Sequence, residues 1–137
     1  MAAPVASYVP VVVSGGLAFV AGQVPLREGK PVATGRLGEG IDTEEGEGLA
    51  RQCALQALAA LRAELGSLDR VTRIVKVGVF VASADTFTEQ PKVANGASDL
   101  LGEVFGEAGK HARAAVGVSA LPLGVPVEVD LIAEVSD

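Results

Sequence analysis

Residues 42–83, DTEEGEGLARQCALQALAALRAELGSLDRVTRIVKVGVFVAS, decide the fold because they join one long amphipathic helix to one long strand. Asp42 or Thr43 can cap the helix, and acidic residues follow where the helix dipole favours negative charge. Gly66 is typical of a helix stop. Apolar residues recur at three- and four-residue steps and predict one buried face, made of Leu49, Ala50, Cys53, Ala54, Ala57, Leu58, Leu61 and Leu65.

The strand that follows alternates in polarity over residues 70–83. Because successive side chains of a strand point to opposite faces, two sets of residues are expected to separate. Val75, Val77, Val79 and Val81 are predicted on one face, and Ile74, Lys76, Gly78 and Phe80 on the other.

The flanking segments predict further strands and a second helix. Residues 8–24 indicate two strands around a Gly15-Gly16 turn, with Pro10 favouring an edge position. A turn at Glu28-Gly29 leads to a short strand or loop near Val32. Pro91 is a favoured first helical position for a helix reaching Phe105, with these residues facing inward: Val93, Ala97, Leu100 or Leu101, and Val104. Residues 112–120 and 127–135 complete the set as strands.

The predicted order is β-β-(β)-α-β-α-β-β in one α+β domain, residues 1–137. Two helices can cover only one face of such a mixed sheet. The other face carries Phe80 and Ile132 beside Glu128 and Asp130, which favours burial against another subunit over contact with bulk water. The sequence therefore predicts an oligomer.

Composition restricts the function classes. The net charge is −6 and no run of Lys and Arg occurs, which argues against a nucleic-acid partner. One Cys and one His give no zinc cage and no disulfide, so no metal is expected, and Cys53 is interpreted as a core residue. No apolar segment approaches the roughly 20 residues of a membrane span, and no basic region precedes the apolar N-terminal stretch. We expect a cytoplasmic protein without a signal peptide or membrane contact.

Residues 110–118, KHARAAVGV, carry the chain's only histidine and an arginine at the start of a strand. Taken alone, Arg113 is either a surface charge or a two-pronged grip for a carboxylate. Glu128 lies either on a solvated face or close enough to hold a water beside Arg113. His111 is either a loop or interface residue or part of a binding site. Spacing alone leaves these alternatives open.

Several longer motifs carry a resemblance to a known family. They are ARAAVGVSALP (Ala112–Pro122), VEVDLIA (Val127–Ala133), FVAGQVPL (Phe19–Leu26) and VKVGVFVASADTF (Val75–Phe87). With these motifs the chain resembles the Rid family of reactive-intermediate deaminases, also called YjgF-like or L-PSP endoribonuclease-like. The resemblance implies a chorismate-mutase-like fold and a homotrimer with its sheets towards the threefold axis and ligand clefts between subunits. It also implies hydrolysis of 2-imino acids to 2-oxo acids and ammonia without metal or organic cofactor.

The resemblance also implies roles for individual residues. Arg113 would bind the substrate carboxylate and Glu128 would position the attacking water. Backbone groups of Gly22 and Ala115 would hold the imine nitrogen or the developing oxygen. Tyr8 would line the cleft, and Asn95 corresponds to the family's helix asparagine. The chain departs from the family at Ala114, Ala115 and Gly117, and its H-A-R-x-A-V-G-V form looks like a distinct branch.

Three functions are considered, two from these residues and a third, endoribonuclease activity, from a label that the family carries. The matched Arg113 and Glu128 favour an imine deaminase, a hydrolase acting on substrates of the 2-aminoacrylate type. A non-catalytic trimer that binds a small carboxylate would keep Arg113 without needing Glu128. The third function, an endoribonuclease, is disfavoured by the acidic charge.

Overall fold

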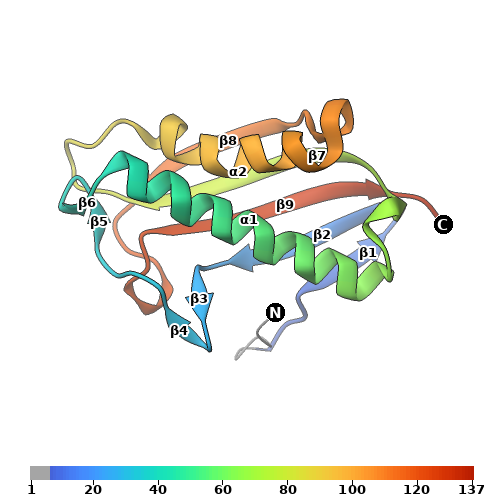
Figure 1. Cartoon of the computed structure of the whole chain (residues 1–137). Helices are drawn as coiled ribbons and strands as arrows, with labels where there is room; N and C mark the ends of the chain where they lie inside the picture. The colour runs from blue at the N-terminus through green and yellow to red at the C-terminus, as the bar shows by residue number, and fades with distance from the viewer. Residues whose placement is uncertain (1–6) are drawn as a thin grey trace.

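The computed structural model describes residues 7–137. The first six residues, part of the stretch from which no signal peptide was predicted, lie outside the described residues. The core of the fold is a five-stranded sheet in the order β1-β2-β9-β7-β8, with two helices on one face (Figure 1). The strands are β1 (Val11–Ser14), β2 (Leu17–Gln23), β7 (Val71–Ala82), β8 (Ala112–Val118) and β9 (Val127–Val135).

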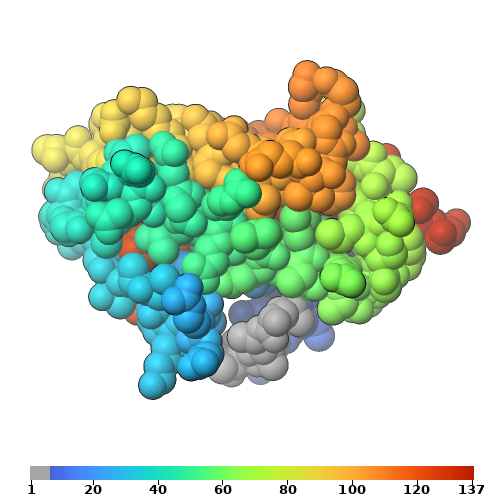
Figure 2. All heavy atoms as spheres, viewed as in Figure 1, coloured from blue at the N-terminus to red at the C-terminus, as the bar shows by residue number. Residues whose placement is uncertain are grey.

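The helices are α1 (Thr43–Leu65) and α2 (Gln90–Phe105), and their atoms cover most of the sheet face seen in Figure 2. Because α2 links β7 to β8, these strands run parallel, whereas the other neighbours in the sheet are antiparallel. The smaller pairs are β3 (Leu26–Arg27) with β4 (Lys30–Pro31), and β5 (Arg36–Leu37) with β6 (Gly40–Ile41). The predicted mixed α+β architecture is confirmed.

The predicted start and stop of α1 are confirmed. The Asp42 carboxylate accepts a hydrogen bond from the Glu45 backbone N–H at 2.8 Å, and the Glu45 carboxylate accepts one from the Asp42 N–H at 3.4 Å. This reciprocal capping box satisfies two helix-end donors. Gly66 ends the helix in the left-handed region at a φ of 85°. Every apolar position predicted for the buried face of α1 is buried.

The predicted hairpin is confirmed, since Gly15 and Gly16 adopt positive φ angles of 61° and 80° between β1 and β2. Strand β1 lies at the sheet edge, as Pro10 predicted.

The prediction for the first half of β7 is wrong. Val75 is 37% exposed, whereas Ile74 is fully buried. Ile74 pairs with Ala133 and Lys76 with Ile132, so β7 carries one extra residue there, a bulge that reverses the alternation. Beyond the bulge, Val77, Val79 and Val81 are buried as predicted.

The prediction for Val104 is also wrong, because Val104 is 45% exposed in the last turn of α2. The adjacent Phe105 packs against the core in its place. The other inward positions predicted for this helix are buried.

The sheet face away from the helices carries an apolar row. Residues directly opposite on neighbouring strands share a face, and Val12 lies opposite Phe19, Phe19 opposite Ile132, and Phe80 opposite Val116. Phe19 is 41% exposed and Val116 44% exposed. We call this surface the far face. Within residues 7–137, no helix combines the length and the apolar character needed to cross a membrane.

Candidate functional site

Arg113 projects from the sheet edge onto α2. It pairs with the buried Val77, which places its side chain on the helix side of the sheet. Its Nη1 donates hydrogen bonds to Asn95 Oδ1 at 2.8 Å and to Ser98 Oγ at 3.0 Å, and its Nη2 donates to the Pro91 carbonyl at 3.3 Å. The structure therefore brings together Arg113 and Asn95, two of the residues singled out by the sequence.

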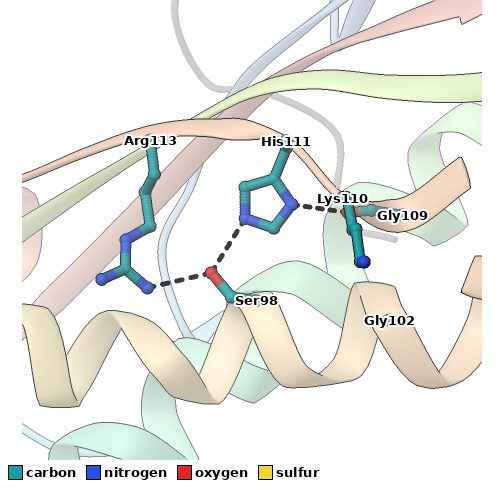
Figure 3. Close-up of a pocket in the computed structure, with 6 residues that line it drawn as sticks. All are labelled: Ser98, Gly102, Gly109, Lys110, His111 and Arg113. Carbon is teal, nitrogen blue, oxygen red and sulfur yellow. Dashed lines mark hydrogen bonds between the residues drawn. The ribbon is translucent and has the colours of Figure 1, made fainter. Parts of the chain in front are cut away.

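A pocket of about 460 Å³ opens beside this arginine, lined by Ser98, Gly102, Gly109, Lys110, His111 and Arg113 (Figure 3). Arg113 and His111 both point from the start of β8 towards Ser98 on α2. Lys110 forms an exposed ion pair with Glu107 at 3.1 Å. Among residues 7–137, no carboxylate forms an ion pair with Arg113, so its positive charge remains available to an anion.

The backbone of Ala115 faces the open edge of the sheet. The Val118 carbonyl accepts a hydrogen bond from the Ser83 N–H, just beyond β7, at 3.0 Å. Because backbone groups of a strand turn to alternate sides, those of Ala115 point away from β7. Strand β8 is an edge strand, so these groups are open to a ligand or to another chain.

Glu128 lies on the far face, opposite Phe80 on β7. A Cβ atom at Gly22 would collide with the Glu128 carboxylate in its present position, so these two predicted residues are in contact. Burial, and secondarily the charge of Asp130, raise the pKa of Glu128. Burial also raises the pKa of Asp130, although the Gly78 N–H and Lys76 oppose the shift. A carboxylate with a raised pKa is a better proton acceptor.

Arg113 and Glu128 therefore lie on opposite faces of one sheet, and a single chain does not bring them together. Tyr8 precedes β1, at the edge opposite β8, and is 52% exposed. No hydrogen bond within residues 7–137 joins Tyr8 to the other predicted site residues. The predicted site residues thus form two separate groups, which we call the arginine half-site (Arg113, Asn95 and Ala115) and the glutamate half-site (Glu128 and Gly22).

Sequence reasoning missed Ser98 and left the place of His111 open. Ser98 lies three residues after Asn95, and this spacing puts both on one helix face. His111 lies two residues before Arg113 and therefore shares its side of the strand. These spacings were the available signal, although nothing in the sequence showed that α2 would cross β8 at this point.

Among the remaining reactive groups within residues 7–137, the candidates are a metal centre and a nucleophile. No cluster of three His, Cys, Asp or Glu side chains there could hold a metal ion. Cys53 is buried, and this burial raises the pKa of its thiol, which is the behaviour of an unreactive core cysteine.

Comparisons with known proteins agree over nearly the whole chain. A sequence model described as Endoribonuclease L-PSP matches residues 1–135. Protein TCP17 of Trypanosoma cruzi is 51% identical over 137 residues, covering 99% of this chain and 86% of that protein. The crystal structure of protein Atu1372 from Agrobacterium tumefaciens, described as of unknown function, is 45% identical with a TM-score of 0.91. That match covers 93% of this chain and 82% of the other.

One similar structure contains a small molecule. The crystal structure of Escherichia coli TdcF with bound serine is 25% identical, with a TM-score of 0.68 and coverage of 98% of this chain and 92% of that chain.

Proposed function

Because the chain belongs to the Rid family, also called the YjgF-like or L-PSP family, we propose that it hydrolyses reactive 2-imino acids in clefts built by two copies of the chain. The products would be 2-oxo acids and ammonia. The observation that carries this proposal is the position of Arg113. Hydrogen bonds to α2 hold its guanidinium at a pocket, and the guanidinium has no carboxylate partner among residues 7–137.

The separation of the two half-sites supports assembly as an oligomer, and the family resemblance implies that this oligomer is a homotrimer. Since the sheet lies between Arg113 and Glu128, only a second copy can place a glutamate half-site against an arginine half-site. The apolar far face, with Phe19 and Val116 exposed, gives such a copy a surface to cover. A cyclic arrangement repeats one contact around the axis and completes every cleft.

In the proposed cleft, Arg113 binds the substrate carboxylate with the donors that α2 leaves free. Glu128 of the neighbouring copy orients a water towards C2 of the iminium and accepts its proton. The new C–O bond forms as the C=N π pair moves to nitrogen, giving a carbinolamine. Glu128 then returns this proton to nitrogen, and ammonia leaves as the C2 hydroxyl becomes a carbonyl and gives its proton to the Glu128 carboxylate. Backbone groups of Ala115, and of Gly22 beside Glu128, would hold the nitrogen and the developing oxygen.

The test is release of a 2-oxo acid from 2-aminoacrylate generated in place by a dehydratase. The wild-type protein should accelerate release over buffer. Arg113→Ala should lower kcat/KM about 100-fold, because two charge-assisted hydrogen bonds at about 1.5 kcal/mol each are lost. Wild-type rates equal to buffer, or an Arg113→Ala variant as active as wild type, would refute the proposal.

A non-catalytic carboxylate-binding trimer is the second candidate, favoured by an arginine half-site that needs nothing from Glu128 to bind an anion. TdcF was crystallised with serine, which also carries a carboxylate. Calorimetry with 2-oxobutyrate beside Glu128→Gln kinetics separates the candidates. Binding without turnover selects the module, whereas turnover that collapses in Glu128→Gln selects the enzyme.

The endoribonuclease description of the family ranks third, since a net charge of −6 disfavours a phosphate backbone. The cytoplasm is the location we propose for the deaminase.

A further inference from the structure

We propose that Ser98 and His111 are positioning residues that fix Arg113 for carboxylate binding through one directed chain of hydrogen bonds. The inference deepens the proposed function, on which it rests only for the identity of the bound carboxylate. Figure 3 shows the arrangement: Ser98 Oγ lies between His111 on one side and Arg113 on the other. The distances are 2.9 Å to His111 Nε2 and 3.0 Å to Arg113 Nη1.

The direction of each bond follows from which groups are able to donate. The Gly109 carbonyl only accepts, so the His111 Nδ1 at 2.6 Å carries the ring proton. In the neutral ring Nε2 is then an acceptor, and the Ser98 hydroxyl donates to it. Guanidinium nitrogens only donate, so Arg113 uses a lone pair of Ser98 Oγ. The hydrogen-bond chain thus runs from Arg113 through Ser98 and His111 to Gly109, and each group donates to the next.

The network restrains Arg113 without exhausting its donors. Both hydrogens of Nη1 are used, by Asn95 and Ser98, and one hydrogen of Nη2 is used by the Pro91 carbonyl. The Nε–H and the second Nη2–H remain, which is enough for a two-pronged grip on a carboxylate. A side chain held in its binding conformation loses less entropy when the ligand arrives.

The far end of the chain is anchored in rigid structure. Gly109 is buried with its α carbon tight against the Leu101 carbonyl, where a Cβ would collide with the backbone of α2. The next carbonyl, that of Lys110, accepts a hydrogen bond from Arg73 Nη2 at 3.3 Å. The imidazole is therefore held at both ring nitrogens, by Gly109 and by Ser98.

The first test reads the tautomer of His111 without any ligand. Since His111 is the only histidine, a long-range ¹H–¹⁵N spectrum of histidine-labelled protein at mildly alkaline pH shows one imidazole. We expect Nδ1 protonated and Nε2 bare, with the Nε2 signal shifting in Ser98→Ala. An Nε2–H tautomer, or a spectrum unchanged in Ser98→Ala, would overturn the hydrogen-bond chain whether or not the protein is a deaminase.

The second test measures binding of 2-oxobutyrate by calorimetry, with KM and kcat for 2-aminoacrylate. Ser98→Ala should weaken binding and raise KM about fivefold to tenfold while kcat stays within about twofold, since carboxylate binding is used equally in the ground and transition states. Ser98→Thr keeps the hydroxyl and should restore affinity. Ser119→Ala, the same change at an exposed serine after β8, is the matched control.

A double-mutant cycle shows whether the residues act through one another. The double variant Ser98→Ala/His111→Ala should bind 2-oxobutyrate as tightly as whichever single variant binds it more weakly. Adding Ser98→Ala to Arg113→Ala should cause no further loss of affinity. Multiplying effects, or Ser98→Ala with wild-type affinity, would refute the positioning role. A wild-type protein that shows the expected tautomer but neither binds 2-oxobutyrate nor releases 2-oxo acid would refute the proposed function and the assigned carboxylate, while leaving the hydrogen-bond chain in place.

Discussion

Mixing two inactive variants is expected to restore about one quarter of the wild-type activity if, as proposed, each cleft takes Arg113 from one copy and Glu128 from the next. Arg113→Ala keeps the glutamate half-site, and Glu128→Gln keeps the arginine half-site. In a random equal mixture, a cleft has an intact arginine half-site in about half of cases and an intact neighbouring glutamate half-site in about half. Their product is the restored fraction, whatever the number of copies in the ring.

The assay is 2-oxo acid release from 2-aminoacrylate after the two variants are co-expressed or refolded together. Each variant alone should show about 1% of the wild-type kcat/KM or less, so the restored signal stands well above the background. A matched control mixes Arg113→Ala with the Arg113→Ala/Glu128→Gln double variant, a combination in which no cleft has an intact arginine half-site.

A second mixture sharpens the result. Wild type mixed equally with the double variant should retain about one quarter of the activity if clefts are shared, and about one half if each chain works alone. No restored activity in the first mixture, together with half of the wild-type activity in the second, would refute the inference that each cleft is shared by two copies.

Three further predictions concern the far face, the glutamate half-site and α1. Phe19→Asp should convert the proposed oligomer to monomers on size-exclusion chromatography and abolish turnover, whereas Leu55→Asp, at an apolar position of α1 that is even more exposed, should do neither. An oligomeric Phe19→Asp variant would contradict the role of the far face. Because burial and Asp130 raise the pKa of Glu128, kcat/KM should begin to fall at a higher pH than it would with an ordinary glutamate, and Asp130→Asn should move this fall to lower pH. A pH profile that is unchanged in Asp130→Asn would contradict the role of Glu128 as the proton acceptor. Gly48 lies in an exposed turn of α1, with nothing within 4 Å of an added Cβ. Gly48→Ala should therefore raise the free energy of unfolding, measured in urea, by about 0.5–1 kcal/mol without altering turnover. A destabilised variant would refute the helix-propensity argument.

Local patterns in the sequence were sufficient for the two helices and for the strands of the five-stranded sheet, but not for the short pair β5 and β6. The apolar stripe of α1, the stop at Gly66 and the Gly15-Gly16 turn depend on neighbours within a few residues, and each was predicted correctly. The cap was narrowed to Asp42 or Thr43, and it is Asp42. The bulge in β7 was not predictable, because it is a property of the register between β7 and β9. A one-residue change in register exchanges the two faces, which exposed Val75 and buried Ile74.

The candidate site divides in the same way. The sequence alone, through its motifs, singled out Arg113, Asn95, Ala115, Gly22 and Glu128. Only the tertiary structure decided how they group, because β8 lies at an edge under α2 while β9 lies inside the sheet with Glu128 turned to the far face.

The contact of Ser98 with His111 and Arg113 likewise depends on where α2 crosses β8. Packing of elements distant in the chain determines such contacts. The sequence therefore determined which groups are present, and the tertiary structure decided that one chain holds two separated half-sites.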